Sequence, residues 1–462
     1  MDPWTLWTDY NPRLMTRESW SSRFGFIMAT AGFAIGLGNI WRFPYMTGMN
    51  GGGAFVLVYL TVVALIGLPL LMIEIGLGRK AQSSPITGMA KVVGARSPWM
   101  SIAWLGMLAA VLINAYYVML IGWIAGYTVD TMRGVLTGLS SDQLSSHYAE
   151  FTSTPGPVLF YTLLTVVGLT VVVRRGLGAG VEALSKWAMP ALFVILIVLA
   201  VRSLTLPGAS EGLAWYLTPD FSKVTGDTWL AAIGQAFFSL GVGMAAGFAF
   251  GGYMHPRDSD IPGSVTIVAI CDTAVAFGAG LIIFPALFSF GIAPNQGPGL
   301  LFVTLPQVFG QMAGGTAFGA AFFVLLLLAG ITSAVAIFEV LTASLVDTLG
   351  MERPRAALAS GALWAVLSTL VILGEGPWSS MKLAGLTLFG LLDTLSTNIL
   401  LPVGGLLLAL YAGYVWTFDG FRNEVNVGAG RLRIAAVLRP FVTIVVPLAV
   451  TAMLLAGLGW IG

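Results

Sequence analysis

Charged residues are scarce in this chain of 462 residues, and their scarcity excludes an ordinary soluble fold. Asp, Glu, Lys and Arg together make up 9% of the sequence, and 57% of the residues are hydrophobic. Soluble proteins carry roughly 25% charged residues. Long apolar runs recur from end to end, so we expect a polytopic membrane protein with one integrated domain in the lipid bilayer. The net charge of +1 gives no argument for a nucleic-acid partner, and we expect none.

Cysteine and histidine are almost missing as well. The single cysteine, Cys271, lies inside an apolar run, so the sequence excludes a disulfide framework and a thiolate metal site. The two histidines, His147 and His255, fall on opposite sides of the membrane in the topology below, so they cannot share a metal ion. No apolar core precedes Phe24, and we therefore predict that the N-terminus is not a cleavable signal.

Eleven long apolar segments follow one another, and we interpret each as a transmembrane helix of an all-α polytopic membrane protein. Most of the 22 Lys and Arg residues lie in connections on the side of the N-terminus. By the positive-inside rule we expect a cytoplasmic N-terminus and, with an odd number of spans, an extracellular C-terminus in the inner (cell) membrane. The predicted spans are 24–46, 54–78, 100–130, 156–174, 180–202, 229–254, 262–291, 317–347, 356–374, 386–416 and 434–460.

The segment 22–50 contains the first candidate site. Gly32, Gly36 and Gly38 interrupt an otherwise apolar helix, and each weakens it by about 1 kcal/mol relative to alanine. We therefore expect the helix to unwind near its middle. Backbone groups freed at that depth must line a polar cavity, where the helix ends suit a carboxylate and a cation. Close helix packing is the alternative, but a packing face needs neither the amide nor the charge that follow in this segment.

A second broken helix is predicted at 229–254, where Gly241 and Gly243 lie near the middle. Broken helices at spans one and six indicate a 5+5 inverted repeat with an eleventh helix appended. In the fifth span, Gly180 and Pro190 predict an inner end that unwinds and opens a water path. We divide the chain into a cytoplasmic gate segment (1–23), a first repeat (24–202), an extracellular loop (203–228), a second repeat (229–416), a cytoplasmic loop (417–433) and the eleventh helix (434–462).

Four acidic residues lie inside predicted spans: Glu74, Asp272, Glu339 and Asp393. Ionisable side chains at such depth are functional candidates. For Glu74 we favour a structural role as an acceptor for N–H groups freed in the broken helices. For Glu339 a structural and a functional role both stay open.

Two adjacent hydroxyls, Thr332 and Ser333, lie deep in an apolar helix. Such hydroxyls most often bond to their own helix. Hard cations prefer oxygen ligands, however, and these hydroxyls would bind sodium without adding charge if they faced the freed carbonyls of Gly32 and Ile35.

Specific sequence motifs lie at intervals from the N-terminal segment to span eight. They are Arg17-x-x-Trp20, GLGNIWRFPY at 36–45, NGGGAF at 50–55, the run from Glu74 to Arg79, Tyr116-Tyr117, the run from Gly234 to Phe238, and AGITS at 329–333. On these motifs the chain resembles the neurotransmitter:sodium symporter family, which has the bacterial leucine-transporter fold. It is most similar to the eleven-helix bacterial members that carry hydrophobic amino acids, and the resemblance covers spans one to ten.

The resemblance implies two sodium sites and one substrate site at the broken helices. The first sodium site would use the Ala34 carbonyl, Asn39, Ser239 and Asp272, closed by the substrate carboxylate. The second would use carbonyls of Gly32, Ile35 and Ala329 with the hydroxyls of Thr332 and Ser333. Tyr117 would bind the substrate carboxylate, and Phe238 would cover the pocket. The substrate would lie against Ala34, Gly36, Leu37, Gly38, Ile113, Tyr117, Phe238, Ser239, Gly241, Met244, Ser333 and Ile337.

The resemblance also implies two gates. The inner gate would consist of Arg17, Trp20, Tyr253 and Asp347. The outer gate would use Arg42, but the position of its usual aspartate partner is Ser396 here, with Asp393 one turn earlier. A water-mediated outer gate and a pair of Arg42 with Asp393 therefore stay open as alternatives.

The sequence and the resemblance together predict a sodium-coupled symporter, and not an enzyme, that imports neutral hydrophobic amino acids by alternating access. The predicted side-chain pocket carries no charge, so a charged ligand would be costly to bury. Gly241 removes side-chain volume beside the pocket, so we expect aromatic as well as aliphatic substrates. A non-transporting receptor or sensor on the same fold is the alternative, and a channel fits less well because it needs no occluding gates.

Chloride independence is a further expectation. Chloride-dependent relatives hold the anion among residues that match Tyr59, Gln235 and Ser239, together with a serine whose position is Ala276 here. One turn earlier, Asp272 would supply a fixed negative charge to the first sodium ion, which would make chloride unnecessary.

Overall fold

The computed structural model describes residues 18–255, 260–293, 298–428, 430–457 and 460. Regular structure in these ranges is helical, apart from two isolated β-bridges. The α-helices are α1 (Arg23–Ala34), α2 (Phe43–Met49), α3 (Gly53–Val62), α4 (Leu68–Ala81), α5 (Pro85–Val93), α6 (Ser101–Met132), α7 (Ser141–Ser153), α8 (Pro155–Arg174), α9 (Ala183–Leu204), α10 (Ala209–Leu217), α11 (Gly226–Leu240), α12 (Ala246–Gly251), α13 (Ile261–Ser289), α14 (Thr304–Gln311), α15 (Gly315–Leu349), α16 (Arg353–Glu375), α17 (Leu388–Asp393), α18 (Leu401–Leu410), α19 (Phe418–Val425) and α20 (Val446–Gly457).

Short π-helical segments join several of these α-helices into longer continuous helices. The π-helical turns are η2 (Gly38–Arg42), η3 (Val63–Gly67), η5 (Leu177–Glu182), η8 (Thr394–Leu400), η9 (Tyr411–Val415) and η11 (Phe441–Val445). Such turns occur often at functional sites. The inner end of the fifth span, which the sequence predicts to unwind, is wound as η5 here.

Within the described residues, nine helical segments are long and apolar enough to cross a membrane. A bent pair, α1 with η2 and α2, raises the number to ten. The predicted span 229–254 is divided between α11 and α12, and neither piece is long enough to be counted. The all-helical polytopic fold is thus confirmed, whereas eleven crossings, the inverted repeat and the domain boundaries stay predictions.

Both glycine-containing segments are broken. The first helix stops at Ala34, and its two halves meet at an angle of 52°. The second broken helix, which begins as α11, stops at Gly241, whose φ is +63°. Gly243 and Ala245 also have positive φ. Glycine adopts this left-handed conformation without a steric penalty, whereas Ala245 does so under strain. The surrounding structure must therefore hold Ala245 in this strained conformation.

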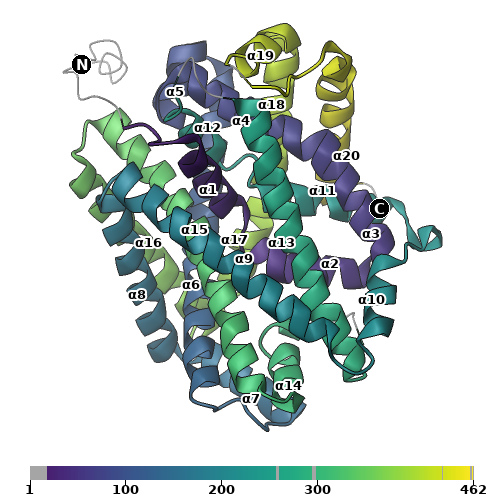
Figure 1. Ribbon diagram of the computed structural model, residues 1–462. Coiled ribbons are helices and arrows are strands. Elements are labelled where there is room, and N and C mark those ends of the chain that lie inside the picture. Colours follow the sequence, from purple (N-terminus) through teal and green to yellow (C-terminus); the bar gives the residue numbers. More distant parts are fainter. Residues whose placement is uncertain (1–17, 256–259, 294–297, 429, 458–459, 461–462) are drawn as a thin grey trace.

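The two ends of the bundle carry different elements (Figure 1). The start of α1 lies at one end with α5 and α19, and we call this end the proximal face. The opposite end, which carries α7 and α14, is the distal face. Between the two faces, α1 packs against α9, α13 and α15, and α6 runs along α15 and α8. The two breaks therefore lie in the interior of the bundle.

Candidate functional site

One cavity lies between the two breaks. It is lined by Phe33, Ala34, Gly36, Gly38, Ile113, Tyr117, Phe238, Gly241, Met244, Ser333 and Ile337. All the predicted substrate residues except Leu37 and Ser239 are among them, and those two are buried nearby. The structure thus brings the predicted residues together, and their role in binding stays a prediction.

The polar end of this cavity is built from the unwound backbone of the first helix. The Leu37 amide donates to the Tyr117 hydroxyl at 3.0 Å. A side chain at Gly36 would not fit, because a Cβ there would lie 2.6 Å from that hydroxyl. On the neighbouring helix, the Ser333 hydroxyl donates to the Phe33 carbonyl at 2.9 Å. Two side-chain hydroxyls therefore meet the freed backbone at one point.

The apolar end contains a residue that the sequence analysis missed. A Cβ on Gly241 would overlap the ring of Phe33, so that ring fills the space which the sequence analysis assigns to a bulky substrate. Phe33 also packs edge-on against Phe250, at 6.2 Å between ring centroids. The only sequence signal for Phe33 was its position next to Ala34. The cover residue Phe238 packs over Gly38, where a Cβ would lie 2.7 Å from its ring.

A buried polar cluster lies beside the cavity and contains three of the predicted ligands of the first sodium ion. The Asn39 amide donates to Asp272 Oδ1 at 2.7 Å and to the Ser239 hydroxyl at 3.0 Å. Ser239 in turn donates to Asp272 at 2.9 Å, and Tyr59 donates to it at 3.3 Å. The Asp272 side chain is 0% exposed. Asp272 thus has three neutral partners, and the chemistry of this set fits a cation.

No group of three or more His, Cys, Asp or Glu residues that could hold a metal ion occurs in the described ranges. A site here would therefore consist of carbonyl, amide and hydroxyl oxygens with one carboxylate. Such a ligand set suits a hard cation rather than a soft transition metal.

The predicted second sodium site lies between α1 and α15. A Cβ on Gly32 would lie 3.1 Å from the Thr332 side chain and 3.6 Å from the Ser185 hydroxyl. In this structure the Thr332 hydroxyl donates to carbonyls of its own helix, Leu328 at 2.9 Å and Ala329 at 3.1 Å. The Thr332 hydroxyl therefore bonds to its own helix, as the alternative expects, and its side chain lies beside Gly32; its role as a sodium ligand stays a prediction. Ser185 is a neighbour that the sequence analysis missed.

At the predicted outer gate, Arg42 and Asp393 each have a neutral partner. The Arg42 guanidinium donates to Gln235 at 3.0 Å and stacks over Phe238 at 5.3 Å. Asp393 accepts from the Tyr116 hydroxyl at 3.0 Å. The Ser396 hydroxyl bonds to its own helix, so it does not replace an aspartate here. A direct pair of Arg42 with Asp393 stays a prediction.

At the predicted inner gate, two of the four residues hold the N-terminal segment to α12. Trp20 donates through its ring to the Phe250 carbonyl at 2.9 Å and through its amide to the Tyr253 carbonyl at 3.2 Å. Asp347 accepts from the Ser84 amide at 2.6 Å. Arg17 lies outside the described residues.

The same face holds an ion network that the sequence analysis did not predict. Tyr253 donates to Glu339 at 2.6 Å, and Glu339 pairs with Arg353 at 2.5 Å. Arg353 reaches on to Glu18 at 2.9 Å. Glu339, whose role stayed open, therefore has an arginine partner. The signal for this network was a buried acid in a span, followed by an arginine at the start of the next helix.

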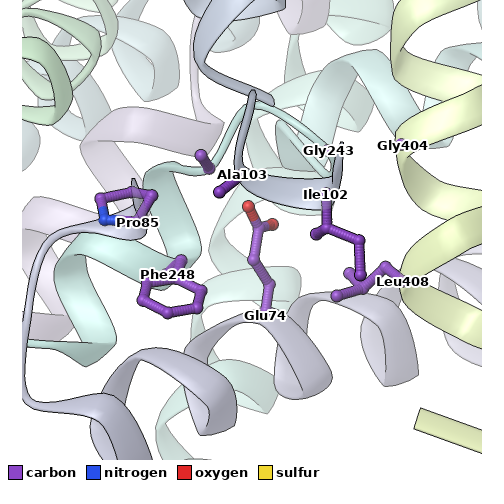
Figure 2. A pocket seen from close by; sticks show the side chains of 9 residues that line it. Glu74, Pro85, Ile102, Ala103, Gly243, Phe248, Gly404 and Leu408 are labelled. Carbon is purple, nitrogen blue, oxygen red and sulfur yellow. The ribbon is translucent and has the colours of Figure 1, made fainter. Parts of the chain in front are cut away.

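Glu74 lies in a second cavity, beside the break in the second helix (Figure 2). Its carboxylate points into a space between Ala103, Ile102 and Phe248. Its Oε2 atom has no hydrogen-bond partner among the described residues, although the carboxylate faces the backbone of Gly243. Glu74 thus lies beside the freed backbone, and its structural role as an acceptor stays a prediction.

Comparisons with known proteins show what the chain is similar to. The model of the sodium:neurotransmitter symporter family matches residues 17–147 and 143–459. An uncharacterized sodium-dependent transporter of Bacillus subtilis is 40% identical over 392 residues, which cover 85% of this chain and 86% of the relative. One of Haemophilus influenzae is 36% identical over 86% of this chain and 89% of the relative. The crystal structure of MhsT with L-phenylalanine superposes with a TM-score of 0.87 at 37% identity, and covers 96% of this chain and 100% of that one.

Proposed function

Because this chain belongs to the sodium:neurotransmitter symporter family, we propose that it couples inward sodium flow to the import of a neutral hydrophobic amino acid. The chain is a sodium-dependent transporter and not an enzyme. The observation that carries the finer proposal is the central cavity. Its polar groups gather at the first break, and the rest of its lining is apolar and carries no charged side chain.

The shape and polarity of the cavity support one orientation of a bound amino acid. The substrate carboxylate meets the backbone of Gly36 and the Tyr117 hydroxyl, and the side chain points toward Ile113, Met244 and Ile337. Burying an unpaired side-chain charge among these residues would be costly, so lysine and glutamate are excluded. The phenylalanine bound to the similar MhsT supports an aromatic substrate.

Two sodium ions accompany the substrate in this proposal. The first is held by Asn39, Ser239, Asp272 and the substrate carboxylate, and the second lies between Gly32 and Thr332. The charged form of a carboxylate buried among neutral partners is costly, and a cation beside it offsets that cost. Because Asp272 supplies the negative charge, transport proceeds without chloride.

The orientation follows from the charges. Lys and Arg gather on the proximal side, so we assign the proximal face to the cytoplasm and the distal face to the exterior of the inner membrane. The Trp20 contacts and the network of Glu339 with Arg353 then close the cytoplasmic side. The gates on both sides favour a transporter that alternates access over a receptor that only binds.

Counterflow in proteoliposomes tests the proposal. Vesicles loaded with unlabelled leucine should accumulate labelled phenylalanine when sodium is present and should retain this uptake when gluconate replaces chloride. Lysine in place of leucine serves as the control and should give no counterflow. Binding without counterflow would support the receptor, and an absolute need for chloride would contradict the role of Asp272.

A further inference from the structure

The cavity that contains Glu74 is separate from the central cavity, and we call it the Glu74 cavity. Each of the two encloses about 320 Å³, and they share no lining residue. The wall of the Glu74 cavity reaches toward the proximal face, because it includes Pro85, the first residue of α5, and Ile102 and Ala103 at the start of α6. A ligand of about the size of the proposed substrate would therefore have a second place on this side of the break.

The Glu74 carboxylate supplies a negative group to this cavity. The residue is 3% exposed, and its side chain points into the cavity (Figure 2). It faces the backbone of Gly243, Ala245 and Phe248, and its Oε2 atom has no hydrogen-bond partner among the described residues. None of the described residues that line the cavity is Lys, Arg or His. The charged form of such a carboxylate is costly, and a cation beside it would offset that cost.

A second oxygen lies at the same wall. A Cβ on Gly404, which lines the cavity, would lie 3.6 Å from the Gly243 carbonyl oxygen, and a Cβ on Gly106 would lie 3.2 Å from it. Carboxylate and carbonyl oxygens only accept hydrogen bonds, whereas an ammonium group carries three donors. Divalent hard cations take about six oxygens or more, so two oxygens suit an ammonium group better than such an ion.

The other side chains of the cavity are apolar, and they define the rest of the ligand. Ile102, Phe248 and Leu408 project around the carboxylate and would enclose a compact hydrocarbon body (Figure 2). The ring of Phe248 would also attract a nearby cation through its face. A carboxylate on the ligand would repel Glu74, so an amino acid is excluded. The chemistry of the wall thus selects a small amine with an apolar body and no acid group.

We propose that the Glu74 cavity binds a small apolar amine, and that an amine bound there slows transport without competing with the substrate. The reason for the inhibition lies in the wall. Gly243 and Ala245 belong to the break in the second helix, and both have positive φ. An occupant would pack against this backbone and restrict its movement. The inhibition rests on the proposed function, whereas the binding of the amine rests on the cavity alone.

Calorimetric titration of the purified full chain with cyclohexylamine tests the binding. Cyclohexanol has the same ring without a charge, so we expect it to bind at least about tenfold more weakly. Glu74→Gln should weaken the binding of cyclohexylamine about tenfold, the ratio expected for the loss of a charge-assisted hydrogen bond. Ala103→Leu should weaken it as strongly, because it fills the cavity and leaves the carboxylate in place.

Two matched controls separate the cavity from general effects. Glu352→Gln removes a carboxylate that is 69% exposed and pairs with Arg355. Ala359→Leu enlarges an exposed alanine on α16. Both should keep the affinity for cyclohexylamine within twofold of wild type. The affinity of Ala103→Leu for phenylalanine should also stay within twofold, because the two cavities share no lining residue.

Uptake of phenylalanine into vesicles tests the inhibition. Cyclohexylamine should lower the maximal rate about tenfold at saturation and leave the KM unchanged, and Ala103→Leu should be resistant to it. A rise in the KM would place the amine in the central cavity and overturn the proposal. Equal binding of cyclohexanol, or wild-type affinity for cyclohexylamine in Ala103→Leu, would overturn it too. A wild-type protein that binds the amine but does not transport would defeat the proposed function alone, so the two failures can be told apart.

Discussion

Two fully buried carboxylates, Asp272 and Glu339, differ in the partners that the fold gives them. Glu339 has an arginine, Arg353, at 2.5 Å and the Tyr253 hydroxyl at 2.6 Å. Asp272 has an amide and two hydroxyls, and within the described ranges no Lys, Arg or His is paired with it. A buried charge needs an opposite charge. Glu339 has one within the protein, whereas in the proposed function Asp272 receives one from a sodium ion.

The two carboxylates also lie in different regions of the molecule. The network of Glu339 joins the N-terminal segment to α15 and α16 at the proximal face. The cluster of Asp272 joins both broken helices to α13 beside the cavity. A permanent partner suits a gate, and a missing partner suits a site that an ion enters and leaves. The predictions below alter one carboxylate or its surroundings at a time.

The largest effect on stability is expected when the partner of Glu339 is removed. Arg353→Met leaves a buried charge without its arginine, which destabilises proteins by about 3–5 kcal/mol. Adding Glu339→Gln should recover most of the loss, because the charge that needed a partner is gone. Thermal unfolding followed by size-exclusion chromatography measures both. A double variant no more stable than the single one would show that Arg353 acts through packing alone.

Removal of the charge of Asp272 should weaken sodium binding rather than destabilise the fold. Asp272→Asn keeps the shape and should raise the sodium concentration for half-maximal uptake about 100-fold, which corresponds to about 3 kcal/mol. Ala276→Ser, added to it, should restore uptake in chloride but not in gluconate. The two media are compared in the same vesicles. Unchanged sodium dependence in Asp272→Asn would remove Asp272 from the ion site.

The second sodium site should show a smaller effect. Thr332→Val keeps the shape and loses the hydroxyl, so we expect a loss of about tenfold in sodium affinity during transport, the size of one hydrogen bond to a charged group. Thr369→Val in α16 is the control, since its hydroxyl bonds only to the Ala365 carbonyl. Sodium titration of uptake measures both. Equal effects in the two variants would contradict a site at Thr332.

The smallest effect concerns substrate size. Gly241→Ser places a side chain where the Phe33 ring lies and strains a backbone with φ of +63°. We expect uptake of tryptophan to fall about fivefold relative to leucine, which corresponds to about 1 kcal/mol of lost packing. Phe33→Leu should restore tryptophan uptake in that variant. Competition of the two amino acids for one site provides the ratio, and an unchanged ratio would mean that Gly241 does not limit the pocket.

The sequence predicts the features of this fold that depend on local properties. The two breaks were predictable because glycine weakens a helix wherever it stands, and the buried acids were recognisable in apolar runs. The predicted pocket residues lie around one cavity because the family motifs fix their positions along each helix. The division of span 229–254 into two short pieces follows from the same glycines.

Other features depend on partners far away in the chain. Arg353 and Glu18 are 335 residues apart, and Arg42 and Gln235 are 193 apart, so no local pattern links them. Phe33 was missed because the direction of its ring depends on the space left by Gly241 on another helix. The hydrogen bonds of η5 with Glu18 and Ser21 likewise join residues far apart in the chain.

Reciprocal coupling is the most direct test of the claim that sodium and substrate meet at Asp272. Binding of labelled phenylalanine is measured from low to saturating sodium, and binding of sodium is measured with and without phenylalanine. If the substrate carboxylate completes the site, each ligand must tighten the other by the same factor, and Asn39→Ala must weaken both together. Phenylalanine affinity that does not depend on sodium in the wild-type protein would contradict the account.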